Sequence, residues 1–302
     1  MGLREQFTGW NPRLWAGWRP NGIGEQKPSH YRDMTKVAWV NRNHPAYAWQ
    51  VLTKGACDGC ALGVAGLHDW TIDGVHLCST RLSLLELNTA DAFDPVILSD
   101  VAALRGRSGG QLRKLGRLGY PMRRRRGQAG FSRVSWDEAL SVLVGGLRAA
   151  DPERVALYLT SRGITNEVYY AAAKAARALG VANVDSAARV CHAPSTVGLR
   201  QTIGVAATTC SFQDVIEAPL VVLWGANPAN NQPVFMKYLY FARQRGCRVV
   251  VVNPYLEPGL ERYWVPSNVE SALFGTQMSD LHVPVRPGGD VALANAVLKV
   301  LL

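Results

Sequence analysis

The sequence predicts an α/β fold, in which a mostly parallel sheet has helices on both faces and follows a small irregular domain that bears cysteines. Three observations carry this prediction. Apolar runs of strand length alternate with helical segments in the later part of the chain, a pattern typical of βαβ units. Glycines follow those helical segments, as they often do at a helix end. Three cysteines, Cys57, Cys60 and Cys78, precede the alternation.

The α/β part begins with a helix over the segment SWDEALSVLVGGL. Ser135 is its expected N-cap, and Glu138 three residues later completes a capping box. The next elements alternate along the chain. They are a strand in RVALYLT, a helix in NEVYYAAAKAARAL ended by Gly180, a strand in PLVVLWG, a helix in QPVFMKYLYFARQRG ended by Gly246, and a strand in CRVVVVN.

Small and polar residues follow three apolar runs, at the strand ends where open α/β sheets bind ligands. Residues 225–228 follow PLVVLW, residues 253–254 follow CRVVVV, and residues 286–290 follow LHVPV. Small residues let backbone amides approach a ligand, and amides at the start of the last helix favour an anion. Each turn alone is ordinary, but together they indicate a nucleotide site. The G-x-G-x-x-G fingerprint is absent, so a standard nicotinamide site is not indicated.

The chain divides into three predicted parts. Residues 1–44 form an irregular arm that packs on another surface, residues 45–130 hold the cysteines and a basic connection, and residues 131–302 form the α/β domain. We expect this domain to be truncated at its C-terminus, because the last helical pattern is still open at residue 302. The tryptophans of the arm are Trp10, Trp15, Trp18 and Trp39.

The composition is that of a soluble globular protein, with 48% hydrophobic and 19% charged residues. No run reaches the roughly eighteen apolar residues of a membrane span, and the start lacks a secretory leader pattern and a twin-arginine pair. These features predict a cytoplasmic protein without a membrane span. Six cysteines in 302 residues are too few for a disulfide scaffold, so the paired ones predict metal ligands or redox groups. Cys210 and Cys247 are expected in the core or in strands, without a role.

A basic segment runs from Arg105 to Arg133. It holds ten Lys and Arg and no acid, which equals the formal excess of +10 for the whole chain. A solvated loop or hairpin with a charge run is the simplest interpretation, and a nucleic-acid surface or a wall facing an anionic cofactor are the alternatives. Only Tyr120 and Phe131 interrupt the run, which disfavours base stacking. No nucleic-acid partner is therefore expected.

Cys191 and His192 are neighbours in the chain. A buried thiol beside an incidental imidazole is the ordinary explanation of such a pair. The functional explanation is a thiolate bound to a soft transition metal next to a proton acceptor.

Four separated motifs resemble, in this order, the front half of the formate dehydrogenase alpha subunits. They are TSRGITNEVYY, VDSAARVCHAPSTVGL, VVLWGANPA and VVNP. The resemblance extends over nearly the whole chain from about Lys54. It implies a Rossmann-like domain of the molybdopterin oxidoreductases, which hold molybdenum or tungsten between two pterin guanine dinucleotides. The implied activity is two-electron oxidation of a small molecule, with electrons passed toward an iron–sulfur cluster and an unidentified electron-transfer partner.

The resemblance also implies roles for single residues. Cys191 takes the place of the cysteine or selenocysteine that ligates the metal, and His192 that of the residue that accepts the substrate proton. Arg162 matches an arginine near the pterin. Asn253 stands where aspartate is commonest, which puts one guanosine contact in doubt. The residues assigned to the guanine dinucleotides are Gly225, Asn227, Asn253, Pro254, Arg286, Gly288 and Asp290.

Members of this family bind a four-iron cluster through four cysteines, of which the first two are spaced C-x-x-C and the third follows four residues later. Cys57 and Cys60 match the first two, and Cys78 is a candidate for the last. Val64 stands at the third place. The resemblance thus implies a [4Fe-4S] cluster that is completed by a non-thiolate side chain, is held by three cysteines, or is lost in this branch.

The connection between Pro254 and Pro284 is longer than in well-understood formate dehydrogenases. Its portion VPSNVESALFGTQ resembles a branch of the family without an agreed substrate, which leaves formate and other small molecules open. Family members run to more than twice this length, so these 302 residues alone are expected to lack turnover. Two other classes stay open, a nucleotide-binding α/β protein without redox chemistry and a basic nucleic-acid-binding module with a small metal site.

Overall fold

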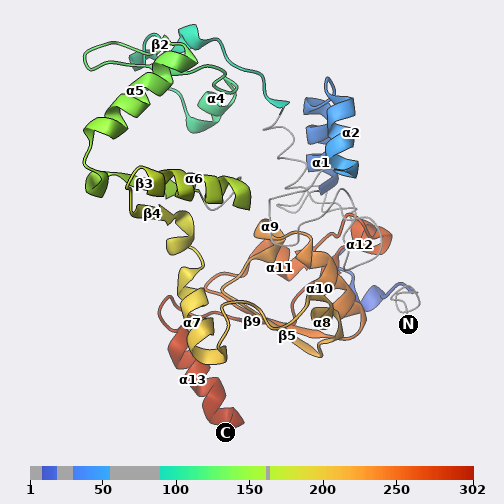
Figure 1. Ribbon diagram of the computed structural model, residues 1–302. Helices are drawn as coiled ribbons and strands as arrows, with labels where there is room; N and C mark the ends of the chain where they lie inside the picture. Colours follow the sequence, from blue (N-terminus) through green and yellow to red (C-terminus); the bar gives the residue numbers. More distant parts are fainter. Residues whose placement is uncertain (1–8, 19–29, 55–88, 161–163) are drawn as a thin grey trace. The chain divides into compact units, whose positions relative to one another are not determined.

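The computed structural model describes residues 9–18, 30–54, 89–160 and 164–302 (Figure 1). The chain divides into two compact units, Asn88–Ala207 and the remainder, which joins Thr208–Leu302 to the residues before 88. Residues 55–88 of the predicted cysteine-bearing domain lie outside the described ranges. The same holds for four predicted site residues, Cys57, Cys60, Cys78 and Arg162.

The unit Asn88–Ala207 contains a hairpin followed by a βαβ motif. Strands β3 and β4 pair in parallel from Ala156↔Asn183 to Leu159↔Ser186, with α6 between them in the chain. Strands β1 and β2 pair antiparallel. The elements in order are η4 (Pro95–Leu98), η5 (Ala102–Leu104), α4 (Gly109–Arg113), β1 (Met122–Arg123), β2 (Ser132–Arg133), α5 (Trp136–Ala149), η6 (Pro152–Arg154), β3 (Ala156–Leu159), α6 (Asn166–Ala178), β4 (Asn183–Ser186), η7 (Ala187–Arg189) and α7 (Ala193–Ile203).

The predicted N-cap of α5 is confirmed, but the predicted capping box is not complete. The Ser135 hydroxyl accepts a hydrogen bond from the backbone N–H of Glu138 at 3.1 Å. The Glu138 carboxylate forms an ion pair with Arg123 at 3.1 Å, whereas a capping box would turn it back to the Ser135 amide. Helix α6 is followed by Gly180 at φ +77°, as predicted for a glycine that ends a helix.

The second unit holds a three-stranded parallel sheet in the order β5-β6-β9 (Figure 1). Its register runs from Leu220↔Arg248 to Trp224↔Val252 between β5 and β6, and Val252 pairs with Val283 of β9. A short antiparallel pair, β7 with β8, lies in the connection from β6 to β9. The elements in order are η2 (Pro12–Leu14), α1 (His30–Val40), α2 (Pro45–Thr53), α8 (Phe212–Glu217), β5 (Leu220–Trp224), α9 (Pro228–Asn231), α10 (Phe235–Gln244), β6 (Arg248–Val252), α11 (Pro258–Glu261), β7 (Arg262–Tyr263), α12 (Val269–Phe274), β8 (Thr276–Gln277), β9 (Leu281–Val283) and α13 (Asp290–Leu301).

One face of this sheet carries the core of the unit. Leu223, Val249 and Val251 are buried with residues of α8 and α10, such as Ile216 and Leu239. Alternate residues of a strand point to opposite faces, and Leu220, Val222 and Leu281 on the other face are exposed. The predicted parallel sheet is therefore confirmed. In the described part of this unit, helices α8 and α10 cover one face, whereas the sequence predicted helices on both.

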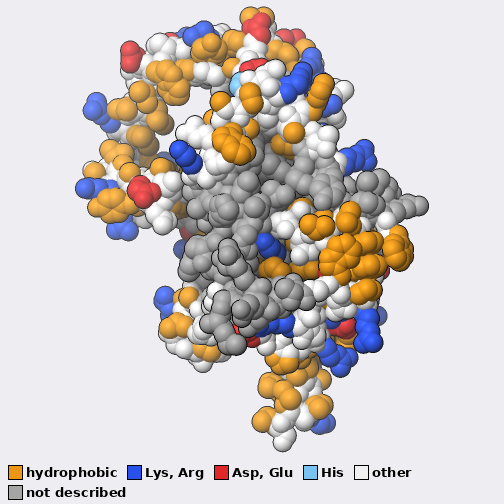
Figure 2. Space-filling model, turned by 90° about the vertical axis from the view of Figure 1, so that its right-hand side faces the viewer, with side chains coloured by type: hydrophobic (Ala, Val, Ile, Leu, Met, Phe, Trp, Pro, Cys, Tyr) orange, Lys and Arg blue, Asp and Glu red, His pale blue; other side chains and the backbone are white. Residues whose placement is uncertain are grey.

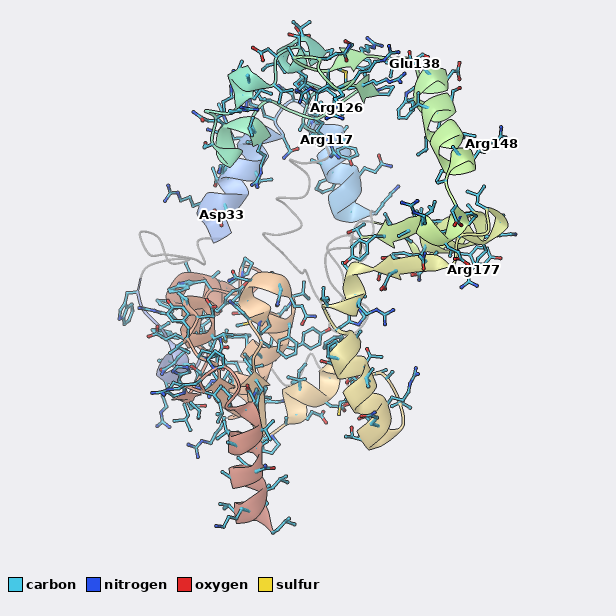
Figure 3. All side chains as sticks on the ribbon, turned by 90° about the vertical axis from the view of Figure 1, so that its left-hand side faces the viewer. Asp33, Arg117, Arg126, Glu138, Arg148 and Arg177 are labelled. Atoms are coloured by element: carbon cyan, nitrogen blue, oxygen red, sulfur yellow. The ribbon has the colours of Figure 1, made fainter. Side chains whose placement is uncertain are left out.

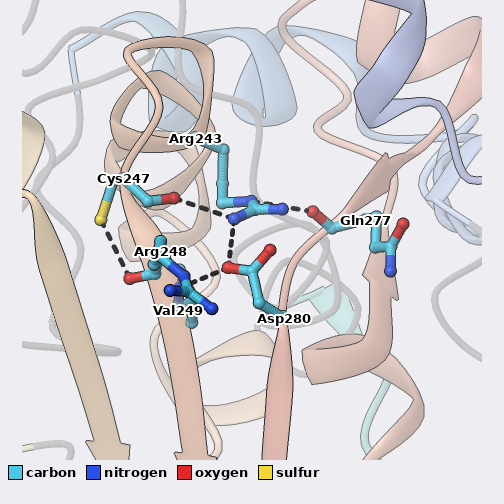
Figure 4. A network of polar contacts seen from close by, with 6 residues as sticks. All are labelled: Arg243, Cys247, Arg248, Val249, Gln277 and Asp280. Carbon is cyan, nitrogen blue, oxygen red and sulfur yellow. Dashed lines mark hydrogen bonds and ion pairs between the residues drawn. The ribbon is translucent and has the colours of Figure 1, made fainter.

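A buried arginine joins α10 to the strands (Figure 4). Arg243 donates hydrogen bonds to the carbonyl oxygens of Cys247 (2.8 Å) and Gln277 (3.2 Å) and pairs with Asp280. The Asp280 carboxylate also accepts from the backbone N–H of Val249 at 2.7 Å. Burial raises the pKa of the Cys247 thiol. The predicted core position is thus confirmed for Cys247 and wrong for Cys210, which is exposed.

The predicted arm is partly helical and partly packed. Residues 30–40, expected to be irregular, form α1, because Val37 is buried and the Asn41 side chain donates to its carbonyl oxygen at 2.9 Å. Residues 9–18 pack as predicted, through Trp15, which stacks on Phe274 of α12 at 3.8 Å between ring centroids. Trp10, Trp18 and Trp39 remain exposed. Figure 2 shows hydrophobic side chains gathered on the side of the structure where α12 lies.

Glu270 of α12 binds residues 9–18 through hydrogen bonds. Only 3% of Glu270 is exposed, so its carboxylate depends on protein donors. Oε1 accepts from the backbone N–H of Asn11 (2.5 Å) and from the Trp15 indole (2.8 Å). Oε2 accepts from the Tyr240 hydroxyl and the Gln244 amide, each at 2.9 Å. The long connection between β6 and β9 thus receives the N-terminal segment.

The free energy of unfolding should fall at alkaline pH because the buried Tyr240 phenol loses its proton. Burial, followed by its bond to Glu270, raises the pKa of the phenol above its ordinary value. The stabilisation by the neutral phenol is therefore fully present below the unfolded-state pKa of about 10 and is lost as pH rises through the folded-state pKa, by at most about 1.4 kcal/mol per pH unit. Urea unfolding between pH 8 and about 11 should show this loss, and Tyr240→Phe should reduce it. Equal pH dependence in Tyr240→Phe and in the exposed control Tyr255→Phe would contradict the expectation.

No helix in the described ranges has the length and hydropathy needed to cross a membrane.

Candidate functional site

The three predicted turns meet at one edge of the β5-β6-β9 sheet. The carboxyl ends of parallel strands lie at the same edge, and backbone bonds fix their order here. The N–H of Gly225 donates to the Val252 carbonyl at 2.9 Å, and the N–H of Asn253 donates to the Val283 carbonyl at 3.2 Å. The structure therefore brings together the turns that begin at Gly225 and Asn253 and the segment after β9.

Two glycines at this edge leave room for a ligand. Gly225 has φ +63° and Gly288 has φ +85°, and a Cβ at either position would meet no atom within 4 Å. The positive φ favours glycine, and the open space leaves the backbone accessible. The turn at Gly288 is closed by a hydrogen bond from the Gly289 N–H to the Arg286 carbonyl at 2.8 Å. Arg286 and Pro254 are both exposed at this edge.

Asn227 supplies an unusual polar atom. Its side-chain oxygen is buried and has no hydrogen-bond partner among the described residues. A buried acceptor without a partner costs about 1–3 kcal/mol, so such an atom points to a donor that a bound molecule would provide. Asn227 stands directly before α9 and does not cap it with its side chain, which leaves no structural use for the amide oxygen in that helix.

Asn253 and Asp290 are already engaged within the chain. The Asn253 side-chain amide donates to the Tyr255 carbonyl at 2.9 Å, and the Asn253 carbonyl lies 2.8 Å from Nε2 of His282. The Asp290 carboxylate accepts from the Trp224 indole at 2.7 Å, which ties the start of α13 to the end of β5. These bonds hold the edge in shape. No local pattern in the sequence indicates the Trp224 contact, because it joins residues 66 positions apart.

Cys191 and His192 lie beyond the carboxyl end of β4, in the other unit. Cys191 is an exposed free thiol, so the ordinary explanation by a buried thiol does not hold. Its N–H donates to the Ala188 carbonyl at 3.1 Å. The exposed His192 is the N-cap residue of α7, and its carbonyl accepts from the N–H of Thr196 at 2.9 Å. Backbone bonds on both sides thus hold these two neighbouring residues between β4 and α7.

An ion pair braces the turn before Cys191. Arg189 donates to the Asp185 carboxylate at 3.0 Å, four residues apart. The hydrogen bond from Arg189 and that from the Ser186 N–H lower the pKa of Asp185, and the bond to Asp185 raises the pKa of Arg189. The Asp-x-x-x-Arg spacing in the sequence could have signalled this pair.

Among the residues that the structure describes, no three His, Cys, Asp or Glu side chains gather so as to hold a metal ion.

Comparisons with known proteins found a matching family model and several similar sequences. The model of the family "Molybdopterin oxidoreductase" matches residues 117–302. An uncharacterized oxidoreductase of Mycobacterium tuberculosis is 32% identical over 203 residues, which cover 67% of this chain and 26% of that protein. Formate dehydrogenase H of Escherichia coli is 32% identical over 191 residues, 62% of this chain and 24% of that enzyme.

Among solved structures, acetylene hydratase from Pelobacter acetylenicus aligns with a TM-score of 0.45 at 18% identity, covering 76% of this chain and 29% of that one. This chain spans about a quarter of the length of the curated relatives that it matches.

Proposed function

Because this chain belongs to the molybdopterin oxidoreductase family, we propose that it forms the front part of an enzyme that oxidises a small molecule by two electrons, as formate dehydrogenases do. The observation that carries the proposal is the match over residues 117–302, together with an exposed Cys191 beside His192 at a strand end. Formate is the first candidate substrate, because a formate dehydrogenase is among the similar proteins.

The residues at the β5-β6-β9 edge fit a guanine dinucleotide. The orphaned oxygen of Asn227 can accept from a guanine N–H, and the open space at Gly225 and Gly288 admits a ligand close to the backbone. Arg286 adds a cation near the start of α13, where phosphates are favoured. We assign Asn253, Pro254 and Asp290 to the same edge, with Arg162 near the pterin.

Molybdenum or tungsten, held by two pterin dithiolenes, would supply the two-electron chemistry. Cys191 would bind the metal through its thiolate, since coordination removes the thiol proton. His192, the next residue in the chain, would accept the proton that the substrate loses, since a neutral imidazole has a nitrogen that can act as a general base. A [4Fe-4S] cluster on Cys57, Cys60 and Cys78 would take up the electrons. We propose a cytoplasmic location for the enzyme.

Metal and nucleotide content test the proposal. Mass spectrometry of the complete enzyme should find molybdenum or tungsten, and acid hydrolysis should release about two guanosine monophosphates per metal ion, as two guanine dinucleotides require. Asn227→Leu should lower the guanosine content, whereas its exposed neighbour on α9, changed as Asn230→Leu, should leave it unchanged. Guanosine without molybdenum or tungsten would instead support a nucleotide-binding protein without redox chemistry. Absence of both guanosine and metal would refute both of these functions.

A further inference from the structure

None of the residues that we assign to the cofactor site lies in the basic segment 105–133. Nine of its ten Lys and Arg residues are exposed, and Arg123 is half-buried in its pair with Glu138. Two acids that precede the segment accept local backbone hydrogen bonds, Asp94 from the Val96 N–H and Asp100 from the Ala102 N–H. A concentrated positive surface of this kind attracts anionic partners over a Debye length of about 10 Å.

The β1–β2 hairpin presents three of these arginines on a fixed turn. The Gln128 N–H donates to the Arg125 carbonyl at 3.1 Å, with Gly127 at φ +86° inside the turn. The Gln128 side chain accepts from the Arg125 N–H at 2.7 Å, and the Gln128 carbonyl accepts from Nε of Arg124 at 2.9 Å. Arg126 stands at the tip. A turn held at this many points presents its charges with little further loss of entropy on binding.

The base of the hairpin is anchored to η4 and η5. Phe131 donates its N–H to the Leu98 carbonyl at 2.7 Å, and Val101 donates to the Ala129 carbonyl at 3.1 Å. Gly130 is buried against Ser99, where a Cβ would lie only 2.0 Å from the Ser99 carbonyl oxygen. The basic turn is therefore a rigid part of its unit.

The residues around these arginines favour a protein as the binding partner over a nucleic acid. Arg133 lies over the ring of Tyr120 at 3.5 Å, so that face cannot stack a base. Phe131 is half-buried, and α4 has five residues, too few to read a major groove. Leu112 and Leu118 are exposed within the same segment, and apolar residues among charges are typical of protein interfaces.

We propose that the segment 105–133, centred on the turn Arg124–Arg126, is the docking surface for a small acidic redox protein. The identity of the partner rests on the proposed function, because an enzyme that oxidises its substrate must pass electrons to an acceptor. Charge complementarity with an acidic carrier would speed encounter and fix its orientation. The surface lies within the unit Asn88–Ala207.

The test measures binding of the complete protein to a strongly acidic [2Fe–2S] ferredoxin by biolayer interferometry. The dissociation constant should rise at least about tenfold between about 50 and about 200 mM salt. Changing Arg124, Arg125 and Arg126 to Gln should weaken binding roughly tenfold or more. Arg125→Gln with Arg126→Gln keeps the Arg124 contact to the turn and should give most of that loss, which guards against misfolding of the hairpin.

A matched control changes three exposed arginines elsewhere in the unit to Gln. These are Arg148 and Arg177, labelled on α5 and α6 in Figure 3, and Arg154. The control removes the same charge and should alter affinity less than about twofold. Equal losses in both triple variants, no binding by the wild type, or tighter binding to duplex DNA or phosphatidylglycerol vesicles than to the ferredoxin would overturn the proposal. Since binding is measured whatever the metal content, absence of molybdenum and tungsten would count against the proposed function alone.

Discussion

Cys191→Ala is expected to abolish formate-dependent dye reduction by the complete enzyme, with a loss of roughly 10³-fold or more, as when a residue that acts directly in catalysis is removed. The thiol is the one described side chain that we assign to the metal. It is exposed, so its removal leaves no cavity in the core. The melting temperature of the variant should therefore match that of the wild type.

Cys210→Ala is the matched control for this experiment. Cys210 is also an exposed free cysteine, and it has no place in the proposed site. This variant should keep its activity within about twofold, as surface substitutions usually do. If Cys191→Ala keeps its turnover, or if both variants lose it equally, the assignment of Cys191 is wrong.

Glu270→Ala should lower the free energy of unfolding by about 3–5 kcal/mol, because it removes a buried charged acceptor and leaves its hydrogen-bond donors without a partner. Four groups would lose their acceptor, namely the backbone N–H of Asn11, the Trp15 indole, the Tyr240 hydroxyl and the Gln244 amide. Two of these belong to the arm, so residues 9–18 should also detach and become sensitive to protease. Urea unfolding and limited proteolysis measure the two effects.

Two further variants separate the hydrogen bonds of Glu270 from general effects of charge. Glu270→Gln keeps the size and one acceptor oxygen, so we expect a smaller loss than in Glu270→Ala. Glu261→Ala removes an exposed carboxylate from α11 in the same connection and should change stability by less than about 0.5 kcal/mol. A loss in Glu270→Ala no larger than in Glu261→Ala would show that the carboxylate does not fasten the arm.

The sequence predicted best where a local pattern decides the structure. Ser135 caps α5, Gly180 follows α6, and the runs around Leu157, Val222 and Val250 form parallel strands, because capping, positive φ and apolar runs are properties of neighbouring residues. The positions of the three turns directly after apolar runs were predicted from the same local patterns. Their meeting at one edge is a consequence of parallel pairing.

Long-range contacts could not be predicted in this way. The local sequence around Glu270 does not indicate its partners, because only the fold brings Asn11 and Trp15 to it across more than 250 positions. The orphaned oxygen of Asn227 and the bond from Trp224 to Asp290 likewise depend on packing. Cys191 is exposed, contrary to the ordinary explanation of a Cys-His pair by a buried thiol.

X-ray absorption at the molybdenum edge of the complete enzyme tests the central claim most directly. The account predicts that the metal in the wild type has one more sulfur neighbour than in Cys191→Ala, with the dithiolene sulfurs unchanged in both. An identical sulfur shell in the two proteins would contradict the account, because it would mean that Cys191 does not bind the metal.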